Sequence, residues 1–131
     1  MSLHISIIAP DRTVWDANAE EVILPSSTGQ IGILRGHAPL LTALDIGVMR
    51  VRIDKDWIPI VLMGGFAEIQ NDQLIILVNA AEEGAKIDKD QAQKELEKMT
   101  LLFNEATSSK ERIEATQNLR RARARVQASA A

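Results

Sequence analysis

The stretch LIILVNAAEEGAKIDKDQAQKELEKM, residues 74–99, contains the point at which the chain changes its hydrophobic period. Residues 74–78 form a short run rich in β-branched and aliphatic side chains, which is typical of a strand. After Gly84, apolar residues instead recur at the spacing of one helical face, beginning with Ala92 and Leu96. The sequence therefore predicts strands before Gly84 and helices after it.

Before Gly84 the chain reads as short strands separated by turn residues. Residues 47–53 alternate so that Met49, Val51 and Ile53 share one face, and an Asp-Lys-Asp turn follows. The other expected strands are His4–Ile8, Glu21–Leu24, Trp57–Met63, then Phe66–Ile69 after a boundary at Gly64-Gly65, and finally residues 74–78. Turn signals about every 8–12 residues favour an antiparallel β-sandwich or barrel. Pro59 inside one run predicts an edge or bulged strand.

Two capping boxes mark the expected starts of two helices. Asp88 with Gln91, and Ser108 with Glu111, have the spacing of an N-cap and the third helical residue. The apolar faces that follow consist of Ala92, Leu96, Met99, Phe103 and Ala106 in the first helix, and of Ala115, Leu119, Ala122 and Val126 in the second. A connection this short requires antiparallel helices. The predicted fold is a β-sandwich or barrel domain over residues 1–84, followed by a C-terminal antiparallel α-helical hairpin over residues 85–131.

The apolar face of the second helix is thin, because two of its four residues are alanine. Burial contributes about 0.8 kcal/mol per CH₂ group, so a buried alanine adds little. The segment is nevertheless rich in Ala and Arg, which are good helix formers. We infer that this helix forms easily, docks weakly and can exchange partners.

The charges of the chain are unevenly distributed. The formal net charge is −3, yet residues 110–131 carry six Lys or Arg and only two Asp or Glu. Residues 1–80 carry five basic and nine acidic residues. The basic C-terminal segment indicates either an acidic partner or a solvated helix face.

Few residues are available for catalysis or for a cofactor. The chain lacks cysteine, which excludes disulfides, thiolate metal sites and cysteine nucleophiles. Its two histidines, His4 and His37, do not have the helical spacing of a metal site, and no Walker-type glycine loop is present. No apolar run of about 18 residues or secretory signal is visible. We expect no catalytic residue, no metal, no cofactor and no autonomous enzyme activity.

A second functional class remains open at this point, because four arginines stand close together near the C-terminus. They would suit an arginine-tail adaptor for nucleic acid, although the interleaved aromatic residues of a single-strand binder are missing. Retention on DNA or RNA at about 0.15 M salt would identify such an adaptor.

Residues 28–47, TGQIGILRGHAPLLTALDIG, closely resemble the epsilon-subunit family of F-type ATP synthases. The glycines, His-Ala-Pro and Leu-Leu-Thr-Ala occur in the order of the family. Val-Trp-Asp at residues 14–16 and Leu-Arg-Arg-Ala-Arg at residues 119–123 resemble its cyanobacterial and chloroplast branch. The resemblance covers essentially the whole chain.

This resemblance implies a rotor subunit of the central stalk. In the family, the sandwich bridges the gamma subunit and the membrane c-subunit ring, so that ring rotation reaches the catalytic head. The hairpin either rests on the sandwich or extends toward the catalytic beta and alpha subunits, and the extended form impedes ATP hydrolysis. The implied location is peripheral, on the cytoplasmic or stromal side of a thylakoid membrane, and no nucleic-acid partner is implied.

The family also implies roles for individual residues. Gly29, Gln30 and Ile31 match the loop that contacts the ring, and Gln30 stands where some bacterial members have a carboxylate. His37 matches a position near the stalk contacts; alternatively, it fixes its loop through a backbone hydrogen bond.

The segment that approaches an acidic stretch of the beta subunit in the family, and inhibits hydrolysis, corresponds to four arginines. These are Arg120, Arg121, Arg123 and Arg125. Arg121 and Arg125 lie one helical turn apart and could meet one carboxylate cluster together.

Ile87, Asp88, Gln91 and Ala92 keep the frame of the ATP motif Ile/Leu-Asp-x-x-Arg-Ala found in some bacterial members. Gln91 replaces the arginine and removes the guanidinium suited to a phosphate or a base edge. We expect a degenerate motif that binds ATP weakly, with Asp88 serving as an N-cap. The alternative is an ATP-sensing variant of the same subunit. A nucleotide titration of the isolated chain, monitored by NMR, would distinguish the two.

Overall fold

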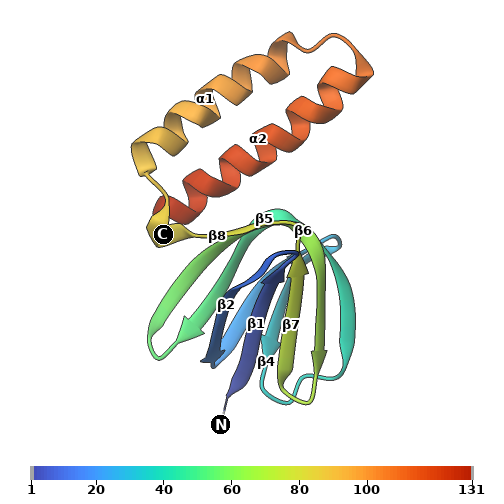
Figure 1. The fold of residues 1–131 in the computed structure, drawn as a ribbon, viewed down its shortest axis with the longest axis vertical. Helices are drawn as coiled ribbons and strands as arrows, with labels where there is room; N and C mark the ends of the chain where they lie inside the picture. The colour runs from blue at the N-terminus through green and yellow to red at the C-terminus, as the bar shows by residue number, and fades with distance from the viewer. Residues whose placement is uncertain (1, 131) are drawn as a thin grey trace.

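The computed structural model describes residues 2–130 as a β-sandwich that carries a pair of helices on one side (Figure 1). The strands are β1 (Leu3–Ala9), β2 (Arg12–Ala19), β3 (Glu21–Ser26), β4 (Gly29–Leu34), β5 (Leu40–Ile53), β6 (Asp56–Gln70), β7 (Gln73–Val78) and β8 (Ala81–Glu83). A short 3₁₀ helix, η1 (Gly84–Lys86), leads to α1 (Lys89–Glu105) and α2 (Ser109–Ala130). The predicted fold class, a β-sandwich followed by an antiparallel helical hairpin, is confirmed.

A single eight-stranded sheet folds over to make both layers of the sandwich. Its order is β2-β1-β7-β6-β5-β3-β4, and β8 adds to β6. Strands β1 and β7 run parallel, whereas every other pair is antiparallel. The expectation of a purely antiparallel sandwich is therefore wrong at this one pair.

The glycine pair Gly64-Gly65 lies inside a strand and does not end one. β6 runs without interruption from Asp56 to Gln70, so the expected boundary is wrong. Both glycines have positive φ, 77° and 139°, and a Cβ on Gly65 would lie 2.0 Å from the carbonyl oxygen of Leu77. The pair lets the long strand bend while it stays close to β7.

Pro59 lies on β6 where the pairing with β8 has ended. On one side Pro59 is the register partner of Arg50 in β5, but β8 pairs only with residues 60–62. Pro59 is thus edge-like on one side of an interior strand, as a residue without a backbone N–H requires.

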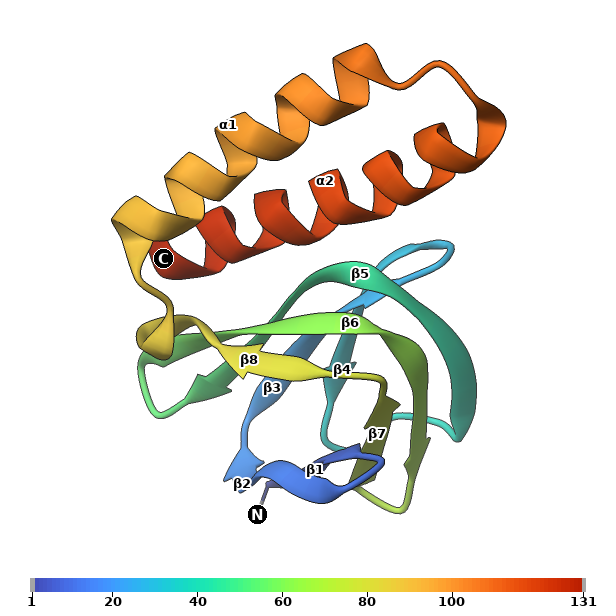
Figure 2. The same ribbon diagram turned by 45° about the horizontal axis from the view of Figure 1, so that its top comes forward.

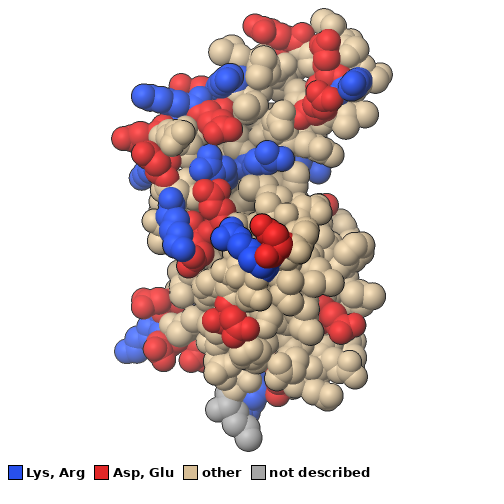
Figure 3. Space-filling view, in the orientation of Figure 1, with Lys and Arg blue, Asp and Glu red and all other residues tan. Residues whose placement is uncertain are grey.

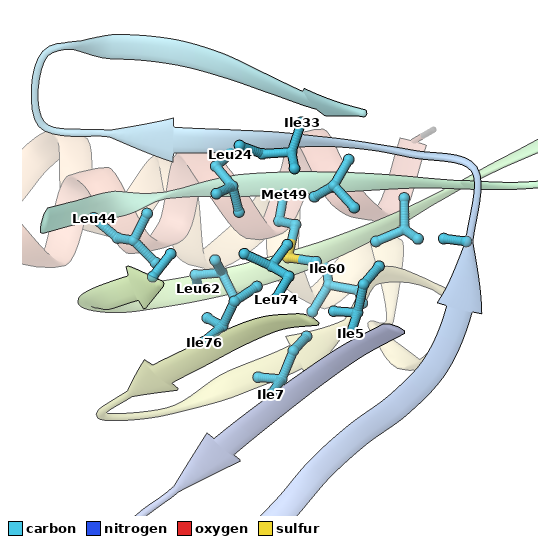
Figure 4. Close-up of a cluster of buried hydrophobic side chains, with 14 of the residues drawn as sticks. Ile5, Ile7, Leu24, Ile33, Leu44, Met49, Ile60, Leu62, Leu74 and Ile76 are labelled. Atoms are coloured by element: carbon cyan, nitrogen blue, oxygen red, sulfur yellow. The ribbon is translucent and has the colours of Figure 1, made fainter. Parts of the chain in front are cut away.

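The interior of the sandwich is filled with aliphatic side chains. Along β7 the side chains alternate strictly between exposed and buried, as a half-buried strand should. The largest fully buried side chains are those of Leu3, Ile5, Ile7, Val22, Leu24, Ile33, Met49, Ile60, Leu62, Ile69, Leu74 and Ile76. In Figure 4 the labelled side chains, such as Ile5, Leu24 and Ile76, project from different strands into one core.

Both helices begin at the caps predicted from the sequence. The backbone N–H of Gln91 donates to Oδ1 of Asp88 at 3.1 Å, and that of Glu111 donates to Oγ of Ser108 at 3.1 Å. The carboxylate of Glu111 also accepts a bond from the N–H of Thr107 at 3.2 Å. These bonds satisfy N–H groups that have no partner within the helix.

Helix α2, and not α1, lies against the sandwich (Figure 2). Ala124 and Ala128 of α2 pack with Val48 of β5 and Val61 of β6. The apolar face expected for this helix did not include Ala124 or Ala128, and Val126, which it did include, is only half-buried. A second narrow alanine face therefore joins the hairpin to the sheet.

Candidate functional site

Arg125 connects three elements of the chain. Its Nε and Nη2 donate to the two carboxylate oxygens of Glu82 on β8, at 2.9 and 3.1 Å. Its Nη1 donates to Oε2 of Glu95 on α1, at 3.3 Å. The hydrogen bonds that Arg125 donates to Glu82, reinforced by the charges of Glu82 and Glu95, raise the pKa of Arg125 above its ordinary value. The side chain is only about 20% exposed, so this ion pair is partly shielded from water.

The other three arginines of the predicted inhibitory segment have a different environment. Arg120, Arg121 and Arg123 are exposed, and within residues 2–130 none of them forms an ion pair. Arg120 and Arg121 line a hollow of about 530 Å³ between α2 and the sandwich, and Asp45 lies in its wall. The structure therefore separates Arg125 from the rest of the segment that the sequence treated as one set.

The residues of the degenerate ATP motif lie around the start of α1, where they pack in the hairpin contact or cap the helix. Ile87 and Ala92 are 7% and 1% exposed and belong to the apolar cluster under the hairpin. Asp88 caps α1, as predicted. Gln91 is exposed, and its backbone N–H is bonded to that cap.

The residues predicted to contact the ring stand at the start of an outer strand, β4. Gly29 and Gln30 are exposed, whereas Ile31 is half-buried against the core of the sandwich. The turn before them is tied to β5 by a bond from the N–H of Ser27 to the carbonyl of Ala43, at 3.0 Å. β4 is an edge strand, so its outer side is open to a partner.

His37 lies in the loop beyond the other end of β4. Its Nδ1 is 2.6 Å from the carbonyl oxygen of Ala38, and the neighbouring N–H of Gly36 donates to Oδ1 of Asp72 at 2.7 Å. These bonds support the interpretation that His37 fixes its loop. The structure does not bring His37 together with the residues at the start of β4.

Exposed apolar side chains lie on the outer side of β5, β6 and β7, and the exposed carboxylate Glu68 lies among them as the register partner of both Leu41 and Ile75. Leu41, Phe66 and Leu77 are 67%, 56% and 52% exposed. Phe66 is the register partner of Ala43 on one side and of Leu77 on the other, so these side chains are neighbours. Figure 3 shows few charged side chains over β1 and β7. We call Leu41, Ala43, Phe66, Ile75 and Leu77 the apolar face. Exposed apolar groups of this kind mark interaction sites.

The described part of the chain offers no ready metal site or membrane span. Between residues 2 and 130, no group of three or more His, Asp or Glu side chains is placed to hold a metal ion. In the same range, neither helix has the length and hydropathy needed to cross a bilayer.

The fold and these surfaces define a small two-part protein, a β-sandwich with an exposed apolar face that carries a docked helical hairpin. Residues 2–84 match the family model for the β-sandwich domain of the ATP synthase delta/epsilon chain, and residues 85–130 match the model for its long α-helix domain. The chain therefore belongs to this family, as an epsilon subunit of the chloroplast and cyanobacterial branch.

Individual relatives agree with this placement. The chloroplastic ATP synthase epsilon chain of Guillardia theta is 80% identical over 131 residues, and the match covers 100% of both chains. The epsilon chain of a Cyanothece species is 59% identical and covers 98% of this chain and 96% of the relative. A chain in the cryo-EM structure of the Euglena gracilis mitochondrial ATP synthase (OSCP/F1/c-ring) has a TM-score of 0.84 at 19% identity. That match covers 99% of this chain and 82% of the other, and it shows the same fold.

Several residues that shape the hairpin contact were not found by reasoning from the sequence. The contacts of Glu82 and Glu95 with Arg125 were not predicted, because Arg125 lies 43 and 30 residues away along the chain. Ala124 and Ala128 have helical i, i+4 spacing, a signal that was available for the second apolar face.

Proposed function

We propose that this chain is the central-stalk rotor subunit of a proton-translocating ATP synthase, and that it has no catalytic residues of its own. In this role the sandwich, residues 1–84, binds the gamma subunit and the c-subunit ring and transmits rotation. The hairpin, residues 85–131, regulates ATP hydrolysis in the catalytic head. The names of the chloroplastic and cyanobacterial relatives support a peripheral position on the stromal or cytoplasmic side of a thylakoid membrane.

The observation that carries the proposal is the apolar face. Phe66 and Leu77 are each more than half exposed on a rigid sheet, and burying them against a partner would contribute about 1.5–3 kcal/mol for each fully buried side chain. We assign this surface to the gamma subunit, because a rotor must hold its shaft through a permanent interface, and such interfaces are apolar.

The test is co-purification with gamma. The double variant Phe66→Asp/Leu77→Asp should fold, since both side chains are exposed, but it should no longer co-purify with a co-expressed gamma subunit. Leu34→Asp is the matched control, because Leu34 is 53% exposed on the distant strand β4. If the double variant retains gamma as well as the control does, the assignment is wrong.

Contact with the ring is assigned to Gly29, Gln30 and Ile31. The support is their position at the exposed start of an edge strand. The chain has no cysteine, so Gln30→Cys would be its only thiol. When an oxidant is added to the assembled enzyme, this thiol should form a disulfide with a cysteine placed in a c subunit, and His37→Cys should cross-link less. Equal cross-linking by both variants would contradict the assignment.

Inhibition is assigned to Arg120, Arg121 and Arg123 of α2, acting on acidic residues of beta when the hairpin is extended. Arg125, the fourth arginine of the predicted inhibitory set, is left out of this test because it is paired within the chain. Exposed charge pairs contribute about 0.2–1 kcal/mol each, so several together could shift a two-state balance by a few kcal/mol. The variant Arg120→Ala/Arg121→Ala/Arg123→Ala should keep its helix, because Ala is the best helix former. It should raise hydrolysis by the reconstituted head, and added salt should weaken inhibition by the parent. Equal inhibition by parent and variant at equal occupancy would refute the assignment.

A further inference from the structure

We propose that Arg125 is a latch that holds the hairpin on the sandwich, and that it opposes the inhibitory action of Arg120, Arg121 and Arg123. The first half of this proposal stands on the structure of the chain alone. The second half rests on the proposed function, because it concerns the effect on ATP hydrolysis.

The geometry gives Arg125 a role that no neighbouring residue shares. From α2 it reaches both oxygens of Glu82 on the last strand of the sandwich and one oxygen of Glu95 on the other helix. A guanidinium that binds a carboxylate with two parallel N–H groups forms one of the stronger polar contacts in proteins. Moving α2 off the sheet would break the contact with Glu82.

The apolar contact around this latch is small. It contains Val48, Val61, Ile87, Ala92, Ala124 and Ala128, with Met63 and Val126 at its border. Half of the six buried residues are alanines, which lose little apolar area when the helix departs. The ion pair of Arg125 therefore adds to an apolar contact that is weak by itself.

Removing the latch would also leave an unfavourable arrangement of charges. Glu82 and Glu95 both bind the same guanidinium, so Arg125→Ala would remove the cation that these two carboxylates share. Both are about one-third exposed, at 34% and 38%, and water would screen part of this repulsion. The charges still favour release of the hairpin once Arg125 is gone.

The four arginines would then affect inhibition of ATP hydrolysis in opposite directions. Arg120, Arg121 and Arg123 are exposed while the hairpin is docked, and in the proposed function they reach the acidic residues of beta once the hairpin extends. Arg125 is occupied by Glu82 and Glu95 in the docked state, and it becomes available only after release. Loss of the exposed arginines should weaken inhibition, whereas loss of Arg125 should strengthen it.

The latch is tested on the full chain by pulsed electron spin resonance. Because the chain has no cysteine, Lys55→Cys in the β5–β6 turn and Lys110→Cys near the start of α2 can carry the only two spin labels. The parent should give one dominant distance. Arg125→Ala should raise the undocked fraction about tenfold, which corresponds to about 1.4 kcal/mol.

The control is Arg123→Ala, an exposed arginine two residues away on the same helix, which should leave the distance distribution unchanged. Glu82→Arg should open the hairpin as Arg125→Ala does, and the exchanged pair Glu82→Arg/Arg125→Glu should restore the dominant distance. If Arg125→Ala matches the parent, or if the exchanged pair stays as open as its single variants, Arg125 is not a latch.

A second measurement separates this proposal from the proposed function. In the reconstituted catalytic head, Arg125→Ala should inhibit hydrolysis more strongly than the parent at equal occupancy. If the distances show release but inhibition does not increase, the latch stands and its opposition to the other arginines is refuted. If the chain does not inhibit hydrolysis at all, the inhibitory role in the proposed function fails, while the distance result still decides the latch.

Discussion

The interior of the sandwich and the contact between sandwich and hairpin are built from different side chains. The interior holds large aliphatic residues such as Ile5, Ile76 and Leu74, each at most 1% exposed. The hairpin contact relies on small residues such as Ala124 and Ala128 and on the ion pair of Arg125. Burial of large aliphatic side chains stabilises a fold strongly, whereas small contacts and one ion pair allow separation and return. The difference indicates a rigid sandwich that carries a releasable hairpin.

The largest predicted difference between the two regions is the effect of a Gly→Ala substitution on the free energy of unfolding. At Gly65 a Cβ would lie 2.0 Å from the carbonyl oxygen of Leu77 and 2.9 Å from Cα of Val78, at a φ of 139°. Strand β7 cannot move aside, so Gly65→Ala should lower the free energy of unfolding by roughly 4 kcal/mol or more. Urea unfolding would measure it.

Gly32→Ala is the control for this prediction. No atom lies within 4 Å of a Cβ at Gly32, so the change should stay within about 1 kcal/mol. Similar losses for both variants would mean that the clash at Gly65 is not what limits stability.

At Gly84 an added Cβ would contact the helical hairpin. A Cβ there would lie 2.6 Å from the carbonyl oxygen of Ala128 on α2 and 2.8 Å from Cγ of Pro59. Pro59 belongs to β6, and its carbonyl oxygen lies 3.0 Å from the same Cβ, so part of the clash is with the sandwich. Because η1 and α2 can both move away from β6, Gly84→Ala should undock the hairpin while lowering the sandwich's free energy of unfolding by less than about 1–2 kcal/mol. Spin-label distances would show the undocking, and urea unfolding would show the stability. A global loss as large as that for Gly65→Ala would contradict the two-region picture.

The degenerate ATP motif predicts that ATP does not stabilise the docked state of the hairpin. A charged bidentate contact contributes about 1.5–3 kcal/mol, and Gln91 cannot supply one, so the dissociation constant for ATP should exceed roughly 1 mM. At 1 mM ATP the docked fraction would then change by less than about twofold. Calorimetry on the isolated chain measures the affinity, with Gln91→Arg as the variant expected to bind more tightly. A micromolar constant for the parent would favour the ATP-sensing alternative.

The smallest predicted effect concerns the edge of the sandwich. His4 on β1 contacts Asn18 and Asp16 on β2, with Nδ1 2.9 Å from Asn18 Oδ1 and Nε2 3.2 Å from Asp16 Oδ1. The hydrogen bond to Asn18, followed by the charge of Asp16, raises the pKa of His4. The charged form is therefore favoured by folding, and its contribution is complete below the ordinary pKa of about 6.5 and disappears as the pH rises through the raised value.

His4→Gln tests this assignment. The difference in urea midpoint between parent and variant should be largest near about pH 5.5 and should shrink toward about pH 8.5. If this difference does not vary with pH, protonation of His4 does not contribute to the stability of the sandwich.

The sequence predicted the fold because its local signals agree with the structure. Residues 74–78 are an apolar run of strand-forming residues and form β7, and Asp88 and Ser108 cap the helices. The outer strands β2 and β4 were missed because they lack clean alternation, and β4 contains two glycines. No local pattern could pair Arg125 with Glu82, because the partners lie 43 residues apart and only the packed fold brings them together.

We infer that the sandwich folds independently and that the hairpin only rests on it. This is tested by urea unfolding of residues 1–84 alone, compared with the full chain. We expect a cooperative transition for the fragment, with a free energy of unfolding within about 2 kcal/mol of the full chain's sandwich transition. A fragment that is unfolded in the absence of urea would contradict it.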